Sequence, residues 1–144
     1  PTSWKVRTYS GRGAMEHAIE KSKNMVKTGK SSLRISSEGG HDTSAYASVE
    51  LKSGVRYSLS AWIKTDRVEG GGMGALLNVH ELGQKAMTKG IRKTNNWKKM
   101  ETVFVNPSFG RRARPSGPNI CQSGRVRCMQ AQAQEQLQVV RLQK

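Results

Sequence analysis

The chain is short of acidic residues, cysteines and long hydrophobic runs, and each shortage excludes a class of protein. Ten aspartates and glutamates stand against 25 lysines and arginines, so the net charge is +15 at pH 7. No stretch of 18 apolar residues occurs, which predicts that no helix spans a membrane. Cys121 and Cys128 have no further cysteine or histidine pair nearby, which excludes the usual zinc site. They form either a small disulfide or two free thiols, and the sequence favours neither.

Recognisable catalytic motifs are also missing. The sequence contains no G-x-S-x-G, no phosphate-binding P-loop and no H-E-x-x-H pattern. Glycoside hydrolysis needs two carboxylates placed on opposite sides of the bond, and the few acidic residues form no such recognisable pair. His41 and Asp42 are adjacent, but they lie in the glycine-rich stretch Glu38–Thr43, which is typical of a turn. The sequence therefore predicts that the protein is not an enzyme.

The excess of positive charge is spread along the chain rather than gathered in one block. It serves either as an ordinary solvated surface or as the attraction for a polyanion: nucleic acid, acidic polysaccharide or a membrane surface. Aromatic residues make up 6% of the sequence, and neither a recognition helix nor a zinc-finger spacing is visible. These features disfavour a specific nucleic-acid partner.

Alternating apolar and polar residues form the main structural signal. They recur in short segments separated by glycine turns: 31–36, 44–51, 57–65, 75–82 and 97–105. Segment 14–27 fits either a helix or a strand followed by a loop. Many short strands with glycine turns predict an all-β fold, a two-sheet antiparallel β-sandwich or a barrel.

Three of these segments carry an apolar face and a polar or aromatic face, because residues two apart on a strand share a face. An aromatic ring flanked by hydrogen-bonding groups suits a hydroxyl-rich ligand such as a sugar. We expect the rings of Tyr46 and Trp62 to form one platform, unless a bulge reverses the strand and buries them. The candidate binding residues on these polar faces are Tyr46, Glu50, Trp62, Lys64, Asn78 and His80.

The end of the chain has a different composition. Residues 106–144 hold seven basic residues and one acidic residue, and glutamines alternate with other residues from 130 to 138. We treat residues 1–144 as one domain in which 106–136 is an atypical basic, glutamine-rich segment. The sequence leaves a strand, a short helix and a low-complexity tail open for the glutamine run. It predicts a closing strand at about 137–142.

Three stretches resemble a known family in order and spacing. They are Gly29–Ser36 (GKSSLRIS), Val49–Thr65 (VELKSGVRYSLSAWIKT) and Lys93–Phe104 (KTNNWKKMETVF). From about Trp4 to Phe104 the chain resembles the β-jelly-roll carbohydrate-binding modules of the family-4/9/22 type, within the galactose-binding-like sandwiches. The chain departs from that family at its end, where Gln138–Leu142 stands in place of a closing strand with paired aspartates.

The resemblance implies a two-sheet jelly roll that binds a polysaccharide or glycan and has no catalytic activity of its own. It also implies a linked glycoside hydrolase in the parent protein, a secreted or cell-surface location and a structural calcium ion. The missing aspartates weaken the calcium expectation, since Ca²⁺ prefers carboxylate ligands, and leave Glu38 and Asp42 as the nearest candidates. The first residues lack the apolar stretch of a signal peptide, and the absence of an initial methionine fits an excised or processed domain. A structural or protein-interaction domain of the same fold is the alternative, together with polyanion binding through the +15 charge.

Overall fold

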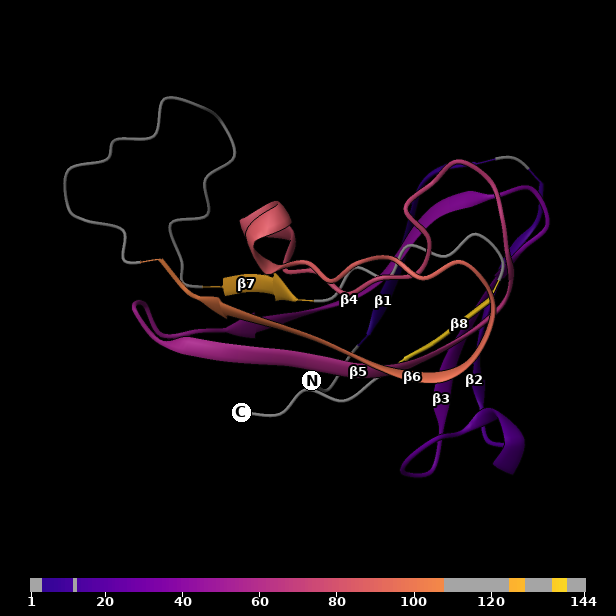
Figure 1. Ribbon diagram of the computed structural model, residues 1–144, viewed down its shortest axis with the longest axis horizontal. Coiled ribbons are helices and arrows are strands. Elements are labelled where there is room, and N and C mark those ends of the chain that lie inside the picture. The colour runs from indigo at the N-terminus through magenta and orange to yellow at the C-terminus, as the bar shows by residue number, and fades with distance from the viewer. Residues whose placement is uncertain (1–3, 12, 108–124, 129–135, 140–144) are drawn as a thin grey trace.

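The computed structural model describes residues 4–11, 13–107, 125–128 and 136–139, the last two stretches by their backbone. Within these residues the chain consists mainly of antiparallel β-strands, joined by loops and two short 3-10 helices (Figure 1). The predicted all-β class is therefore confirmed. The elements are β1 (Lys5–Gly11), β2 (Met15–Glu20), η1 (Lys23–Met25), β3 (Ser32–Ser37), β4 (His41–Glu50), β5 (Arg56–Val68), η2 (His80–Ala86), β6 (Lys93–Val105), β7 (Arg125–Cys128) and β8 (Gln136–Val139).

The described strands form two sheets. One has three strands in the order β1-β4-β7, and the other has five in the order β2-β3-β8-β5-β6. In the five-stranded sheet β5 and β6 are both 13 residues long and pair along most of their length. Figure 1 shows this pair running along one side of the molecule, with β4 and β7 of the other sheet on the opposite side.

Both sheets contribute apolar side chains to one core. Ala45 of β4 lies in the same buried cluster as Ile35 of β3, Ile63 of β5 and Phe104 of β6. The connection between β5 and β6 adds Ala75, Leu77 and Val79 to this cluster. Burying each large aliphatic side chain contributes about 1.5–3 kcal/mol, so the inner faces hold the two sheets together. The outer faces of the two sheets consequently point away from each other.

The alternation predicted for β5 is confirmed. Leu59, Ala61 and Ile63 are at most 2% exposed, whereas Trp62 and Lys64 between and beside them are partly exposed. The pairing register with β6 runs without a shift from Arg56 to Ile63, so no bulge reverses the strand before Trp62. The ring of Trp62 therefore lies on the outer face, as the sequence predicts.

Segment 75–82 is not a strand, contrary to the sequence-based expectation. Its backbone makes isolated bridges, among them Ala75 to Ile91 and Asn78 to Met87, before η2 begins at His80. Leu76, which has the strand parity of the expected polar residues Asn78 and His80, is 1% exposed. The alternation fails because protein packs against both sides of this segment, so parity no longer separates core from solvent.

Two other local expectations are settled by the fold. His41 and Asp42 are not in a turn, because β4 already begins at His41 and the reversal is made at Gly40, whose φ is +71°. Segment 14–27 follows the strand-and-loop alternative rather than the helix, forming β2 and then η1. Backbone pairing of β2 with β3 along Met15–Glu20 outweighs the helix propensity of this segment.

The C-terminal part of the chain contributes strands to both sheets. β7 pairs with β4, and β8 lies between β3 and β5. The predicted closing strand is confirmed for residues 137–139, while its continuation to 142 lies outside the described residues. Cys121 and the start of the glutamine run also lie outside them, as does the side chain of Cys128, so the choice between a disulfide and free thiols stays a prediction. No helix in the described part of the chain is long and apolar enough to cross a bilayer.

Candidate functional site

Trp62 forms the centre of a mixed aromatic and polar surface on the five-stranded sheet. Its neighbours along β5, Ala61 and Ile63, point into the core, so its partly buried ring points outward. Directly opposite on β6 lies Lys99. The Lys27 ammonium, from the β2–β3 connection, lies 4.9 Å from the centroid of the indole ring. The structure thus presents an indole face with the Lys27 ammonium placed over it.

Arg34 supplies an oriented set of hydrogen-bond donors on the same side of the sheet. It alternates with the core residues Leu33 and Ile35, so its guanidinium lies on the outer face. Its Nε donates to Glu20 Oε1 at 2.7 Å, and its Nη1 donates to Ser36 Oγ at 3.1 Å. The two charged side chains are about one-quarter exposed, at 26% and 25%. This ion pair holds the guanidinium in a fixed orientation, which favours recognition of hydroxyl or anionic groups.

Glu101 of β6 is held ionised on this surface. Ser58 Oγ donates to Glu101 Oε1 at 2.6 Å, and Lys99 Nζ lies 3.2 Å from Glu101 Oε2. The Ser58 hydrogen bond and then the Lys99 ammonium hold the pKa of this carboxyl below its ordinary value of 4.5. We call the outer surface that these strands share the Trp62 face, and define it by Glu20, Arg34, Ser60, Trp62, Lys64, Lys99 and Glu101.

Tyr46 lies on the other sheet. It sits on β4 between Ala45 and Ala47, which are 0% and 2% exposed, and opposite Lys5 of β1. Its partly exposed ring therefore points away from the core on the outer side of the three-stranded sheet. Glu50 follows on the same strand with the same parity. We call this surface the Tyr46 face and define it by Lys5, Tyr46, Ser48 and Glu50.

The expectation of one platform that contains both rings is wrong. Because the two sheets share one core, Trp62 with Lys64 and Tyr46 with Glu50 lie on opposite outer faces. Alternation assigns each residue to a side of its own strand, but it does not say which sheet the strand joins. The structure accordingly divides the predicted binding set.

Asn78 and His80 form a third group, in the connection between β5 and β6. Asn78 is half-buried, and its backbone bridges to Met87, while His80 is exposed at the start of η2. Both residues also have interactions with other parts of the protein. Figure 1 shows η2 beside β7, and η2 contacts both β7 and β6. These two residues therefore do not share a strand face with Trp62.

The structure adds residues to the Trp62 face that the sequence did not single out. Arg34 had the necessary signal, since it alternates with Leu33 and Ile35 in a predicted strand. The position of Lys99 opposite Trp62 depends on strand register, which the sequence did not provide. The contact between Lys27 and Trp62 depends on the path of a loop, and only the lysine-rich composition of residues 21–30 pointed to it.

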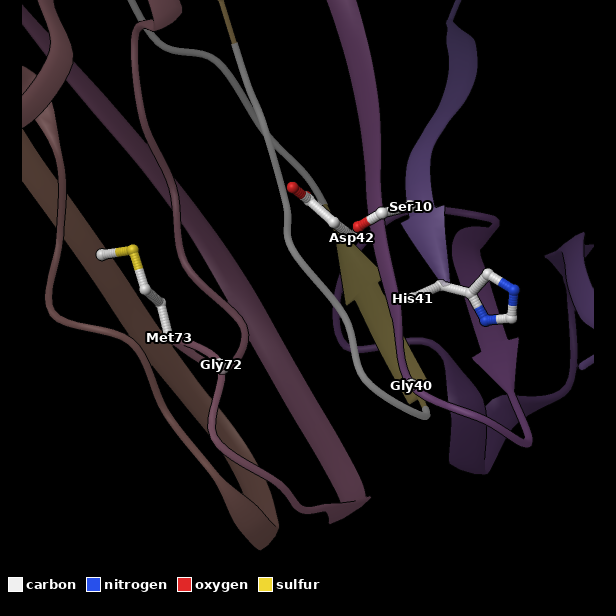
Figure 2. A pocket seen from close by; sticks show the side chains of 7 residues that line it. Ser10, Gly40, His41, Asp42, Gly72 and Met73 are labelled. Carbon is white, nitrogen blue, oxygen red and sulfur yellow. The ribbon is translucent and has the colours of Figure 1, made fainter. Parts of the chain in front are cut away.

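A pocket of about 260 Å³ lies between the glycine-rich loop after β5 and the paired ends of β1 and β4. Figure 2 shows Ser10 and Asp42 on one wall and Met73 with Gly72 on the other, while the His41 ring points away from Met73. This volume is just below the range of about 300–1,000 Å³ common for ligand sites. The polar side chains that line the pocket are those of Ser10, His41 and Asp42, fewer than the Trp62 face offers.

His41 contributes to packing and local hydrogen bonding at this edge. It is 7% exposed, and its Nδ1 shares a hydrogen bond with Ser37 Oγ. Gly11 packs against its ring so closely that a Cβ on Gly11 would overlap the imidazole. Neighbouring positions on a strand point to opposite sides, which separates the imidazole of His41 from the carboxylate of Asp42.

The calcium ion implied by the resemblance gains no support from the donor set. Among the residues that the structure describes, no group of three or more histidines, cysteines, aspartates or glutamates is placed to hold a metal ion. Calcium sites usually take six to eight oxygen ligands, with carboxylates prominent among them. Glu38 and Asp42, the candidates from the sequence, therefore do not by themselves fit such a site.

Comparisons with known proteins identify no family for this chain. No protein-family model matches the chain, and no curated protein matches it significantly.

Proposed function

We propose that the chain is a non-catalytic carbohydrate-binding module that holds a polysaccharide or glycan on the Trp62 face. The observation that carries the proposal is the partly buried indole of Trp62, which lies outward on a strand between two core residues. Sugar rings have apolar C–H faces that pack on an aromatic ring, and hydroxyl edges that need hydrogen-bond partners. Ser60, Lys64 and Arg34 supply such partners from β5 and β3 of the same sheet.

A jelly-roll sandwich is the architecture that we propose for this module. Eight described strands in a three-stranded and a five-stranded antiparallel sheet, with a common core, agree with that architecture. The exposed outer face of a sheet is broad enough for an extended polymer, whereas the pocket at His41 is not. The resemblance to family-4/9/22 modules points to the same ligand class.

A bound sugar has to displace Lys27 from the indole ring. An exposed cation–π contact contributes about 0.5–1 kcal/mol, and this is the cost of moving the ammonium aside. Covering roughly 100 Å² of apolar surface on the ring and the sugar together contributes about 2.5 kcal/mol. Stacking therefore outweighs the cation–π contact, and Lys27 acts as a displaceable cover.

The module would act by proximity. In a parent protein with a linked glycoside hydrolase, a bound polysaccharide raises the effective concentration of substrate at the enzyme. Such a role belongs to a secreted or cell-surface protein, and it requires no reaction at Trp62. A structural calcium ion is not needed for it.

The test is affinity electrophoresis of the native chain in gels that contain glucans, xylans, mannans or acidic polysaccharides. The protein migrates toward the cathode because its net charge is +15. We expect one or more polysaccharides to retard the protein. Trp62→Ala should lower the affinity by roughly 10- to 30-fold, which corresponds to the stacking energy less the Lys27 contact. Tyr46→Ala is the matched control, because it removes an outward aromatic ring from the opposite sheet. Circular dichroism confirms that both variants are folded.

Two outcomes would overturn the proposal. If no polysaccharide retards the native chain, the Trp62 face is not a carbohydrate site. If Tyr46→Ala abolishes retardation while Trp62→Ala leaves it unchanged, binding occurs on the three-stranded sheet instead.

A further inference from the structure

The connection between β2 and β3 brings a concentrated positive charge beside Trp62. Residues 21–31, which we call the basic connection, contain four lysines and no acidic residue. All four lysines are exposed to solvent. Figure 1 shows the connection projecting from the end of β2 and β3. The four lysines are Lys21, Lys23, Lys27 and Lys30.

The basic connection is tied to the sheet rather than hanging free from it. Met25 N donates to Ser22 O at 2.9 Å, which closes the short turn of η1. Ser32 Oγ then donates to Met25 O at 2.6 Å and fixes this turn to the start of β3. Lys27 of this connection lies over the Trp62 ring, so the connection brings an ammonium group to the border of the Trp62 face.

The acidic residues of the Trp62 face do not neutralise these lysines. Glu20 pairs with Arg34, and Glu101 pairs with Lys99. Within the part of the chain that the structure describes, no carboxylate forms an ion pair with Lys64 or with a lysine of the basic connection. The surface around the indole therefore has a surplus of positive charge.

We propose that the basic connection makes the Trp62 face selective for an anionic polysaccharide, one whose sugars carry carboxylate or sulfate groups. This inference rests on the carbohydrate-binding function proposed above. When a sugar stacks on Trp62 and displaces Lys27, the lysine stem keeps the ammonium near the bound ring. An anionic substituent then replaces the lost cation–π contact with an ion pair, whereas a neutral sugar offers only hydroxyls.

The arrangement also sets an expected salt dependence. Exposed ion pairs are screened over a Debye length of about 8 Å at physiological ionic strength, while stacking on an indole is not. The affinity for an anionic glycan should therefore fall as the salt concentration rises. The part of the binding free energy that comes from stacking on Trp62 should remain. Attraction by net charge alone would lose nearly all of its affinity in high salt and would not need the ring.

The experiment compares two fourfold variants that carry the same net charge. The first replaces Lys21, Lys23, Lys27 and Lys30 of the basic connection by Gln. The control variant replaces Lys5, Lys52, Lys85 and Lys89, which are exposed on other elements, by Gln. Isothermal titration calorimetry measures binding of oligogalacturonate and dextran sulfate, with galacto-oligosaccharide and dextran as their neutral counterparts.

We expect the first variant to bind the preferred anionic glycan about tenfold more weakly than the native chain, since each exposed ion pair contributes roughly one- to fivefold. Binding of a neutral glycan should not fall. The control variant should keep most of the native affinity. Oligogalacturonate and dextran sulfate show which anionic group is preferred.

Equal loss in the two variants would overturn the inference, because diffuse net charge would then explain the attraction. Tighter binding of a neutral glycan than of its anionic counterpart would overturn it as well. Equally tight binding of oligothymidylate that survives Trp62→Ala would indicate a nucleic-acid or general polyanion surface instead. If Trp62→Ala abolishes glycan binding but the first variant does not weaken it, the inference alone fails; if Trp62→Ala has no effect on any glycan, the proposed function fails too.

Discussion

The two outer faces of this protein differ in how they present an aromatic ring. On the Trp62 face the indole lies opposite Lys99 and shares the outer side of its sheet with Arg34 and Lys64, and a lysine from a neighbouring loop covers it. On the Tyr46 face the phenol lies opposite Lys5 on a sheet of three described strands. Both rings follow the same alternation on their strands, and both are partly exposed.

The comparison shows that strand parity is not sufficient to define a binding surface. A surface also needs neighbours on adjacent strands and loops that converge on the same ligand. On the Trp62 face such neighbours are the ion-paired guanidinium of Arg34, the hydrogen-bonded carboxylate of Glu101 and the ammonium of Lys27 over the ring. We therefore assign the proposed function to one face, and the predictions below test the difference between the faces.

The largest expected effect separates the inner from the outer side of β5. Ile63→Ala should lower the free energy of unfolding by about 2–5 kcal/mol, because Ile63 is fully buried in the core shared by both sheets. Lys64→Ala, one residue further along, should change it by no more than about 0.5 kcal/mol. Urea unfolding followed by circular dichroism measures both. Comparable losses would mean that Lys64 is also packed, and that β5 does not have distinct inner and outer sides.

Removing the cover from the indole should strengthen neutral-sugar binding. Lys27→Ala eliminates a cation–π contact of about 0.5–1 kcal/mol, so a neutral glycan should bind roughly two- to fivefold more tightly. Titration calorimetry measures this change in affinity, using a neutral glycan that the native protein binds. Lys5→Ala, on the Tyr46 face, is the control and should leave the affinity unchanged. Weaker binding by Lys27→Ala would contradict the displacement of Lys27 by sugar.

The ion pair between Arg34 and Glu20 should contribute a small but measurable coupling. A double-mutant cycle with Arg34→Ala and Glu20→Ala should give about 0.5–1 kcal/mol, because both side chains are only one-quarter exposed. Arg67 and Asp66, 3.6 Å apart and much more exposed at 74% and 43%, form the control pair. Their coupling should be close to zero in thermal unfolding. A larger coupling energy for Arg67 and Asp66 than for Arg34 and Glu20 would mean that Arg34 is not held on the Trp62 face.

The smallest effect concerns acid. The pKa of Glu101 is held below its ordinary value of 4.5 in the folded protein by Ser58 and Lys99. A lowered folded pKa gives stability that is present above about pH 4.5 and is lost as pH falls through the folded value. Carbon-detected NMR titration of the Glu101 carboxyl should show the lowered pKa in the native chain. Ser58→Ala should raise it toward 4.5, and no change in that variant would contradict the hydrogen bond.

The sequence predicted more of the fold than of the site. Alternation correctly placed Leu59, Ala61 and Ile63 in the core and Trp62 outside, because strand parity is local and β5 keeps an unbroken register there. It failed at 75–82, where protein covers both sides of the segment and Leu76 is as buried as Leu77. A local pattern carries no information about what packs on its second face.

The site depends on long-range contacts that no local pattern encodes. The separation of Tyr46 from Trp62 follows from the sheet that each strand joins, and the pairing of Trp62 with Lys99 follows from strand register. Lys27 reaches the indole through the path of a loop 35 positions earlier in the chain. The lysine-rich composition of that loop was visible in the sequence, but its position beside an aromatic ring was not.

The most direct test of the account observes the indole itself. Indole N–H signals of the three tryptophans, assigned with Trp62→Phe, can be followed by ¹H–¹⁵N NMR while an anionic or neutral oligosaccharide is added. We expect the Trp62 signal to shift in a saturable way and the Trp4 signal to stay in place. A shift confined to residues of the Tyr46 face, with the Trp62 signal unchanged at saturation, would contradict it.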